Sequence, residues 1–344
     1  MSPKKEKVGL YFKKESALEF VPSGCQLLDK VLGGGYVLGR ITNIVGDKSS
    51  GKTLAAIEAC ANFILKYPKG NIWYHESEAA FDIPYAETLG LPVDKVEFVE
   101  GNTIGALFRS LEEKIKNCKD QPGLYIVDSL DAFTDADELE RDIDKGSFGA
   151  KKAKQLSEMF RRLIQDLSKS NILVIIISQI RDKIGITFGE TKGRSGGRAL
   201  DFYASQVIWL SELKKIPKTV KGITRPVGVQ IKAKCKKNKV GMPFRECEFP
   251  IIFNYGVDDM LASLEWLKTI KALAEIDIPE RLLERTAKKA AFDDELKTKI
   301  QNQVNKYWDA IEKEFLPKFS KYGSRVKPDD LEEPEEGDVL QEEV

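Results

Sequence analysis

GDKSSGKT, at Gly46–Thr53, matches the phosphate-binding pattern G-x-x-x-x-G-K-[ST] at every fixed position. Its glycines let backbone N–H groups come close to a polyphosphate, because no side chain stands in the way. Lys52 supplies a positive charge for the outer phosphates, and the Thr53 hydroxyl is a ligand for Mg²⁺. We therefore expect a nucleotide to bind through Gly46, Asp47, Lys48, Ser49, Ser50, Gly51, Lys52 and Thr53.

The segments on either side of this loop fit the same interpretation. Residues 40–45 (RITNIV) are rich in β-branched residues and predict a short strand that leads into the loop. Residues 53–66 predict a helix, because apolar residues recur there at helical spacing. The N-terminus of this helix would direct its partial positive charge at the phosphates. Its apolar face is expected to hold Leu54, Ile57, Ala61, Ile64 and Leu65.

The composition is typical of a soluble protein, since the 344 residues include 42% hydrophobic and 31% charged residues. The longest aliphatic run, residues 172–177, is too short to span a bilayer, and residues 1–9 contain no apolar signal region. The five cysteines show neither metal nor disulfide spacing, which indicates thiols in a reducing cytoplasm. The single histidine, His75, excludes a multi-histidine metal site. We therefore expect a cytoplasmic protein with no membrane partner.

The net charge of zero conceals an asymmetry along the chain. Residues 326–344 carry nine acidic residues and one lysine, a net charge of −8, which leaves +8 on the rest. Residues 212–245 alone hold eleven Lys/Arg residues and one acid. A basic body with an acidic tail favours a polyanionic partner and a tail that competes with it. A solvated face with a solubilising tail explains the same charges.

Strong apolar runs alternate with helical patterns between residues 22 and 258. This alternation predicts an α/β fold, with a mostly parallel central sheet covered by helices on both faces. Strands are expected at residues 71–75, 96–99, 124–128, 172–178 and 206–210, and helices at residues 104–118 and 150–169. Further strands, in antiparallel pairing, are expected within residues 227–256.

The ends of the chain differ from this core. Residues 1–21 form a short basic arm, in which residues 8–12 (VGLYF) could be an isolated strand. The predicted α/β core occupies residues 22–258. Residues 259–325 switch to a helical period and predict a small helical C-terminal domain. Residues 326–344 have the acidic, proline-containing composition of a disordered tail.

Three acidic residues at or just after the ends of predicted strands are candidates for the chemistry. A phosphate-binding loop needs a second strand that ends in an acid near Mg²⁺, and LYIVD ends in Asp128. A hydrolase also needs a group that orients or deprotonates water. Glu76 and Glu78 follow another strand, at the edge of the sheet where ligands bind. They alternate along the chain, and periodicity does not choose between them.

The strand that ends in Ser178-Gln179-Ile180-Arg181 leads into a glycine-rich, basic segment at residues 182–198. A glutamine at this strand end can report whether the outer phosphate is present. A loop of 17 residues with no structure of its own is usually functional. Cations interleaved with Ile184, Ile186 and Phe188 are what single-stranded nucleic acid binding requires.

These residues resemble the RecA family of DNA recombinases over about residues 22–258. The resemblance rests on GDKSSGKT (46–53), SEAAFD (77–82), VDS (127–129), SQIRDKIGITFG (178–189), GGRALDFYAS (196–205) and KKNKVGMPF (236–244). It implies an ATP-dependent homologous-recombination protein, with DNA-stimulated ATP hydrolysis and the cofactors ATP and Mg²⁺. The implied partners are single-stranded DNA, a homologous duplex and further copies of the chain in a helical filament.

The resemblance also implies a role for individual residues. Glu78 matches the catalytic glutamate, and Gln179 matches the sensor of the γ-phosphate. Asp128 would hold Mg²⁺ together with Thr53, and Asp82 and Tyr85 would lie near the adenine. Lys237 and Lys239 match a pair that reaches a neighbouring subunit's ATP. The residues implied to contact DNA are Phe148, Gly149, Arg161, Arg181, Lys183, Ile184, Phe188, Gly196, Gly197 and Arg198.

The chain departs from the family pattern in several places. The region after residue 259 is more helical than the family's C-terminal domain, and only residues 8–12 could supply the family's strand that docks on the next subunit. Asp47-Lys48 stands where bacterial relatives usually have Pro-Glu, Ser178 stands where Asn is usual, and the N-terminal arm is short. The short arm leaves open an accessory DNA-binding ATPase without strand exchange. A hexameric helicase or translocase is a second alternative, which the lysine pair and the glycine-ended loop disfavour. A metabolic P-loop kinase would have no role for the basic loop.

Overall fold

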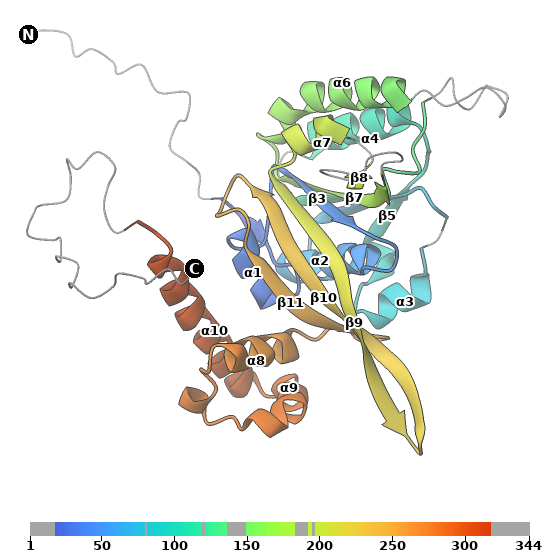
Figure 1. Cartoon of the computed structure of the whole chain (residues 1–344). Coiled ribbons are helices and arrows are strands. Elements are labelled where there is room, and N and C mark those ends of the chain that lie inside the picture. Colours follow the sequence, from blue (N-terminus) through green and yellow to red (C-terminus); the bar gives the residue numbers. More distant parts are fainter. Residues whose placement is uncertain are drawn as a thin grey trace, which may run out of the picture.

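The computed structural model describes residues 18–79, 81–118, 121–135, 149–182, 192–194 and 197–317. Within these residues a ten-stranded sheet forms the centre of the molecule (Figure 1). Its strands are β3 (Ile41–Gly46), β4 (Asn71–Glu76), β5 (Val96–Val99), β6 (Gly123–Asp128), β7 (Ile172–Asp182), β8 (Lys192–Arg194), β9 (Gln206–Val220), β10 (Ile223–Asn238), β11 (Glu246–Ile252) and β12 (Gly256–Val257). A separate antiparallel pair joins β1 (Phe20–Val21) to β2 (Tyr36–Val37).

The strand order is β12-β11-β10-β9-β3-β7-β6-β4-β5, with β8 paired to β7. All strands from β9 to β5 in this order are parallel, whereas β10, β11 and β12 are antiparallel to their neighbours. The predicted fold class is therefore confirmed: the sheet is mostly parallel and helices follow at the C-terminal end. The apolar run of residues 172–177 is fully buried in β7, as expected for a central strand covered on both faces.

Helices cover both faces of the sheet (Figure 1). Their bounds are α1 (Gln26–Leu32), α2 (Lys52–Lys66), α3 (Ile83–Thr88), α4 (Ile104–Asn117), α6 (Gly149–Leu167), α7 (Gly197–Tyr203), α8 (Asp259–Thr269), α9 (Leu283–Ala290) and α10 (Asp294–Glu314), with short 3₁₀ turns at Val93–Lys95, Ala274–Ile276 and Glu280–Leu282. Two apolar cores result. One joins α1, α2 and the C-terminal helices to the sheet, and the other joins α4, α6 and α7 to it.

Two details of the sequence prediction were wrong. Leu65 is not on the buried face of α2, because its side chain is 79% exposed in the last turn of that helix. The segment after Gln179 is not without structure of its own. Strand β7 continues to Asp182 and pairs antiparallel with β8, at Lys192–Arg194, and α7 begins at Gly197. The described residues of the predicted loop therefore belong to β7, β8 and α7, and residues 183–191 and 195–196 lie outside the described residues.

The β9–β10 hairpin is much longer than the predicted strand at residues 206–210, and it projects beyond the core (Figure 1). Its tip is a two-residue turn at Lys221-Gly222, where φ is +50° and +80°. Two successive positive φ angles are characteristic of a type I′ turn, whose twist matches that of the flanking strands. Most side chains in the projecting part of this hairpin are exposed and polar. They show no alternation of apolar and polar residues, so the sequence did not predict these strand ends.

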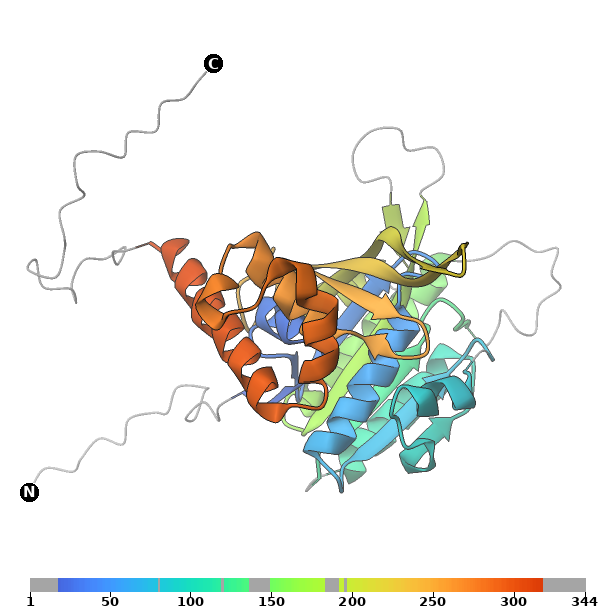
Figure 2. The same ribbon diagram turned by 90° about the horizontal axis from the view of Figure 1, so that it is seen from below.

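The C-terminal helices α8, α9 and α10 form one group that packs beside α1 and β11 (Figure 2). Asp258 and Asp293 cap two of them, since their side chains accept hydrogen bonds from Leu261 N and Leu296 N, each at 3.0 Å. No helix among the residues that the structure describes is long and apolar enough to cross a membrane. All five cysteines are buried thiols.

Three half-buried carboxyl groups lie where the core meets α8. Asp29 accepts a hydrogen bond from Ser23 N, Glu58 from Val257 N, and Asp259 from Gln26 N. Burial raises the pKa of Asp29 and of Glu58 to about 7, and that of Asp259 to about 6. Because folding raises each pKa, these acids stabilise the fold fully below about pH 4. That contribution is lost as the pH rises through 6 to 7.

We therefore expect the apparent melting temperature to fall between pH 5 and pH 8. Asp29→Asn keeps an acceptor for Ser23 N but cannot ionise, so it should reduce this fall by a few degrees, at roughly 2–4 °C per ~1 kcal/mol. Asp293→Asn is the control. The hydrogen bond from Leu296 N lowers the pKa of Asp293, so ionisation of Asp293 stabilises the fold as the pH rises, opposite to that of Asp29. Equal pH dependence in Asp29→Asn and the wild type, by thermal denaturation, would contradict the prediction.

Candidate active site at the ends of the central strands

The loop between β3 and α2 requires glycine at two positions. A Cβ atom on Gly46 would lie 2.2 Å from Ser50 Oγ and 2.9 Å from Leu210 O. Gly51 has a φ of +83°, and a Cβ atom there would lie 2.6 Å from Ile251 Cδ1. Any side chain would therefore force the loop open. The Ser50 hydroxyl donates to Asp47 O at 2.8 Å and closes the loop on itself.

The N-terminus of α2 supplies an anion-binding surface. No side chain caps this helix, which begins at Lys52 directly after Gly51. The first N–H groups of a helix have no partner within it, and they carry the partial positive charge of the helix dipole. Lys52 Nζ donates to Asp47 O at 2.6 Å, and burial lowers the pKa of this ammonium group. Phosphate oxygens fit this donor set, because they would satisfy both the N–H groups and the buried ammonium group.

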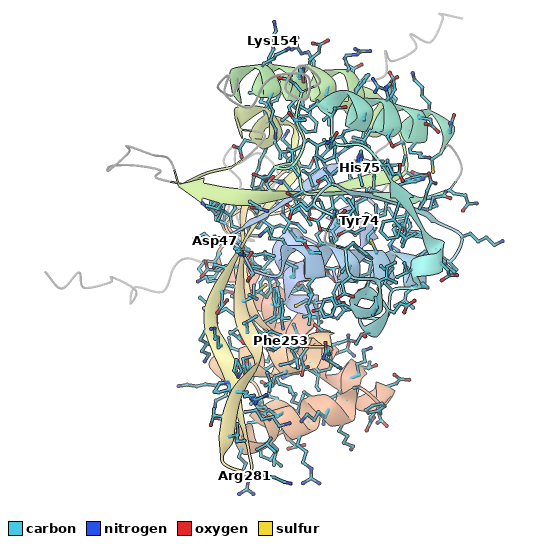
Figure 3. The ribbon with its side chains drawn as sticks, turned by 90° about the vertical axis from the view of Figure 1, so that its right-hand side faces the viewer. Asp47, Tyr74, His75, Lys154, Phe253 and Arg281 are labelled. Carbon is cyan, nitrogen blue, oxygen red and sulfur yellow. The ribbon has the colours of Figure 1, made fainter. Side chains whose placement is uncertain are left out.

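Asp128 lies in the same place, at the end of β6. It is 8% exposed and accepts a hydrogen bond at 2.8 Å from the hydroxyl of Tyr74, which lies in the interior of the molecule (Figure 3). Burial raises the pKa of Asp128, and hydrogen bonds from Tyr74 and Thr53 lower it. The structure thus brings Thr53 and Asp128 together. A hydroxyl and a carboxylate are ligands that suit Mg²⁺, which usually takes one or two carboxylates and completes its shell with phosphates and water.

The two candidate glutamates have different surroundings. The carboxylate of Glu76 accepts hydrogen bonds from Glu78 N at 3.0 Å and from Ala79 N at 2.8 Å, so it holds the turn after β4. The side chain of Glu78 is exposed. Its Oε1 atom accepts a hydrogen bond from Gln179 Nε2 at 2.9 Å and another from the Ser129 hydroxyl. Glu78 is therefore the carboxylate that solvent can reach beside the loop.

Gln179 is fixed from a second side. Its backbone N–H donates to Asp131 Oδ2 at 2.7 Å, while its side chain reaches Glu78. Strands β3 and β7 place Gln179 opposite Gly46, the first residue of the phosphate loop. The sequence interpretation missed the roles of Ser129 and Asp131. Ser129 follows Asp128 directly and was noted only as part of VDS (127–129), without a role, whereas Asp131 lies in a segment with no recognisable pattern.

The family of the chain is decided by sequence comparison. The sequence profile of the RecA N-terminal domain matches residues 4–258. The chain belongs to the RecA family. It is similar to protein RecA of Gloeothece citriformis (33% identical, 71% of this chain and 66% of the relative), of Prochlorococcus marinus (34%, 71% and 62%) and of Synechocystis sp. (32%, 72% and 68%). The matched region spans less than two thirds of the first two relatives.

Two further residues of the predicted nucleotide site lie at the start of α3. Asp82 caps this helix, since Asp82 Oδ1 accepts a hydrogen bond from Tyr85 N at 3.0 Å. Tyr85 packs partly buried against the core, and burial raises its pKa. The negative charge of Glu58 adds to that rise.

Lys237 and Lys239 of this RecA-family chain lie far from its own phosphate loop. Lys239 N donates to Ser205 O, and Ser205 N donates to Ile41 O, so Lys239 is level with the first residue of β3. The loop leaves β3 at Gly46, five residues later, which is about 16 Å at ~3.3 Å per residue. Both ammonium groups contact Phe202 O at the end of α7, at 3.0 and 3.3 Å.

The residues predicted to bind DNA are only partly visible. Arg161 is exposed on α6, and Gly149 is the first residue of that helix. Arg181 lies in β7, and Gly197 and Arg198 lie in the first turn of α7. Phe148, Lys183, Ile184, Phe188 and Gly196 lie outside the described residues, as do the N-terminal arm and the acidic tail.

Proposed function

We propose that this RecA-family ATPase is a homologous-recombination protein. It would form a helical filament on single-stranded DNA, with ATP and Mg²⁺ between adjacent subunits, and pair that strand with a homologous duplex. The observation that carries this proposal is the hydrogen bond between Gln179 Nε2 and Glu78 Oε1. It joins the candidate water-activating carboxylate to β7, the strand that continues into the predicted DNA-binding segment.

The residues around the phosphate loop would have separate roles in ATP binding and hydrolysis. ATP with Mg²⁺ supplies the phosphoanhydride bond and the divalent charge. The N–H groups at the start of α2 and Lys52 bind the phosphates, while Thr53 and Asp128 hold the metal. Glu78 accepts a proton from the attacking water. Gln179 lies opposite Gly46 and donates a hydrogen bond to Glu78. Occupancy of the outer phosphate position would therefore change the position of Gln179 and of β7, the strand that leads to the DNA.

A second subunit would complete the site. Lys237 and Lys239 lie at the end of β3 remote from the loop, so they are placed to reach another subunit's phosphates. Large apolar side chains nearby are exposed: Phe202 is 69%, Met242 48% and Phe244 68% accessible. The Lys239 ammonium lies 5.9 Å from the centre of the Phe202 ring. Cations beside exposed apolar groups support a protein partner at this face.

We also propose a division of the chain that follows these roles. Residues 1–21 are an arm for oligomerisation, residues 22–258 the ATPase core, residues 259–325 a helical C-terminal domain and residues 326–344 an acidic tail. The family match ends at residue 258, and the first C-terminal helix begins at the next residue.

Electron microscopy with single-stranded DNA and a non-hydrolysable ATP analogue tests the proposal. We expect helical filaments that require both ligands, together with exchange of a homologous strand in a gel assay with ATP. Closed rings would instead indicate a hexameric translocase. DNA binding without polymer or strand exchange would indicate an accessory ATPase. Either of these results would overturn the proposal.

The segment from Arg181 to Arg198 should be the main DNA contact, and its two residue classes should behave differently. Arg198→Ala removes a phosphate contact, so it should lower the salt dependence of binding by roughly 0.7 in log–log slope. Ile184→Ala removes a contact with the bases, so it should weaken binding with little change in slope. The measurement is DNA affinity against salt concentration. If both variants bind DNA with wild-type affinity, this segment is not the main DNA contact, and the basic residues 212–245 become the candidate site.

A further inference from the structure

Helix α10 is fastened to the core by a row of polar contacts. Gln26 Nε2 donates to Gln301 O at 2.9 Å and to Asn305 Oδ1 at 3.1 Å. Lys30 Nζ pairs with Asp309 Oδ1 at 3.0 Å. A fourth contact, from Glu312, follows one turn later. These four residues recur at intervals of three or four, so they form one stripe along α10. We call Gln301, Asn305, Asp309 and Glu312 the docking stripe.

The last contact of the docking stripe is the strongest. Arg245 Nε lies 3.0 and 2.9 Å from the two carboxylate oxygens of Glu312, and Arg245 Nη2 lies 2.6 Å from Oε2. Both side chains are 26% exposed, so the pair is partly shielded from water. Charge-assisted bonds between an arginine fork and a carboxylate fix direction as well as distance. Glu312 therefore holds Arg245 in one orientation.

Arg245 ends the loop that follows the lysine pair. Cys235 N donates to Arg245 O at 2.9 Å, and Phe244 N donates to Cys235 O at 2.7 Å, so the end of the loop is bonded to the strand just before Lys237. The start of the loop is also fixed. Asn238 Nδ2 donates to Leu32 O at the end of α1, at 3.0 Å.

The loop has little room to move between these two anchors. Asn238 Oδ1 accepts hydrogen bonds from Val240 N and Gly241 N, each at 3.0 Å. A Cβ atom on Gly241 would lie 3.2 Å from the Cα of Gly33. The segment from Asn238 to Arg245 is thus clamped between α1 and α10. A shift of α10 moves Arg245, and through the Cys235 bond it moves the strand that carries Lys237.

We propose that α10 positions Lys237 and Lys239 for the neighbouring subunit's ATP, with Glu312 and Arg245 as the positioning residues. This inference rests on the proposed function, because it needs the lysine pair to act across a subunit boundary. The C-terminal helices lie beyond residue 258, where the family match ends. Their docking stripe contacts α1 and Arg245, and Arg245 O accepts a hydrogen bond from Cys235 N, two residues before Lys237. Through this link they would control ATP turnover in a neighbour and not in their own chain.

The test uses full-length Glu312→Gln, which keeps the size of the side chain and removes its charge. We expect DNA-stimulated ATP turnover to fall about 10- to 100-fold, the scale expected of a misplaced reacting group. The affinity for ATP should not change, because the phosphate loop is untouched. Glu280→Gln is the matched control. It breaks the 3.2 Å ion pair with Lys268 in the same helical region, away from the loop, and should leave turnover unchanged.

Mixing experiments distinguish misplaced lysines in Glu312→Gln from a general loss of folded protein. Glu312→Gln should be rescued by Lys52→Ala protein, whose lysine pair is intact, and not by Lys237→Ala protein, whose lysine pair is defective. If Glu312→Gln only impairs folding, neither protein will restore its turnover, and this result would overturn the inference. Wild-type turnover in Glu312→Gln would also overturn it. The double variant Arg245→Glu/Glu312→Arg should restore part of the turnover. The mixture of Lys52→Ala with Lys237→Ala checks the proposed function by itself, and its failure would show that the lysines do not act across subunits.

Discussion

Glu78→Gln is expected to lower ATP turnover by about 10²–10⁴-fold, the usual contribution of a catalytic acid or base. ATP affinity should stay near that of the wild type, because the substitution leaves Lys52 and the N–H groups of α2 in place. Glutamine also keeps an oxygen that can accept the hydrogen bonds from Gln179 and Ser129. The measurement is steady-state ATP hydrolysis with single-stranded DNA, together with nucleotide binding at equilibrium.

Two further variants make this result specific. Glu76→Gln weakens the turn after β4 by removing one of two acceptors, so it should have a much smaller effect on turnover than Glu78→Gln. Lys52→Ala should lose both binding and turnover, because it removes a phosphate contact. Wild-type turnover in Glu78→Gln, with loss of turnover in Glu76→Gln, would reverse the assignment of the two glutamates.

Lys237→Ala is expected to reduce DNA-stimulated turnover by about 10³-fold or more, on the scale of cations supplied in trans to a transferring phosphoryl group. Its own phosphate loop remains intact, since Lys237 lies beyond the start of β3. ATP binding to the isolated subunit should therefore be unaffected. Turnover is measured with single-stranded DNA, and binding is measured without it.

Mixing Lys237→Ala with Lys52→Ala protein should recover part of this activity. In a mixed assembly, some interfaces join an intact loop on one subunit to intact lysines on the next. The recovery should depend on the ratio of the two proteins and be greatest when they are mixed equally. Absence of recovery at every ratio, with co-assembly shown by sedimentation, would assign the lysines to another role.

The sequence predicted the central part of the fold because its signals are local. A β-branched strand, a glycine loop and a helix follow one another between residues 40 and 66, and the buried strands are continuous apolar runs. Leu65 was misplaced because helical periodicity cannot show where the last turn of α2 leaves the core. Periodicity left the choice between Glu76 and Glu78 open for a related reason. Alternation holds only within a strand, and β4 ends at Glu76.

The contacts that complete the site were beyond sequence reasoning because they join distant residues. Asp131 holds Gln179 N across 48 positions, and Arg245 meets Glu312 across 67. Each of these side chains has an ordinary charged neighbourhood in the sequence. Only the sheet order and the packing of α10 bring the partners together. Ser129 is the exception, since its place after the strand-end acid could have marked it.

The lysine pair and the phosphate loop lie at opposite ends of β3, so an assembly in which one chain's lysines reach the next chain's loop has two different ends. Under the proposed function each chain would carry two unlike half-sites, and contacts between them would join subunits head to tail. At one end of an open polymer, a bound nucleotide has no lysines from a neighbour. At the other end, lysines face solvent with no nucleotide to reach. Hydrolysis is then slow in the terminal subunit of one end only. In the proposed filament the two ends would therefore gain and lose subunits at unequal rates, and the filament would grow along its DNA in one direction.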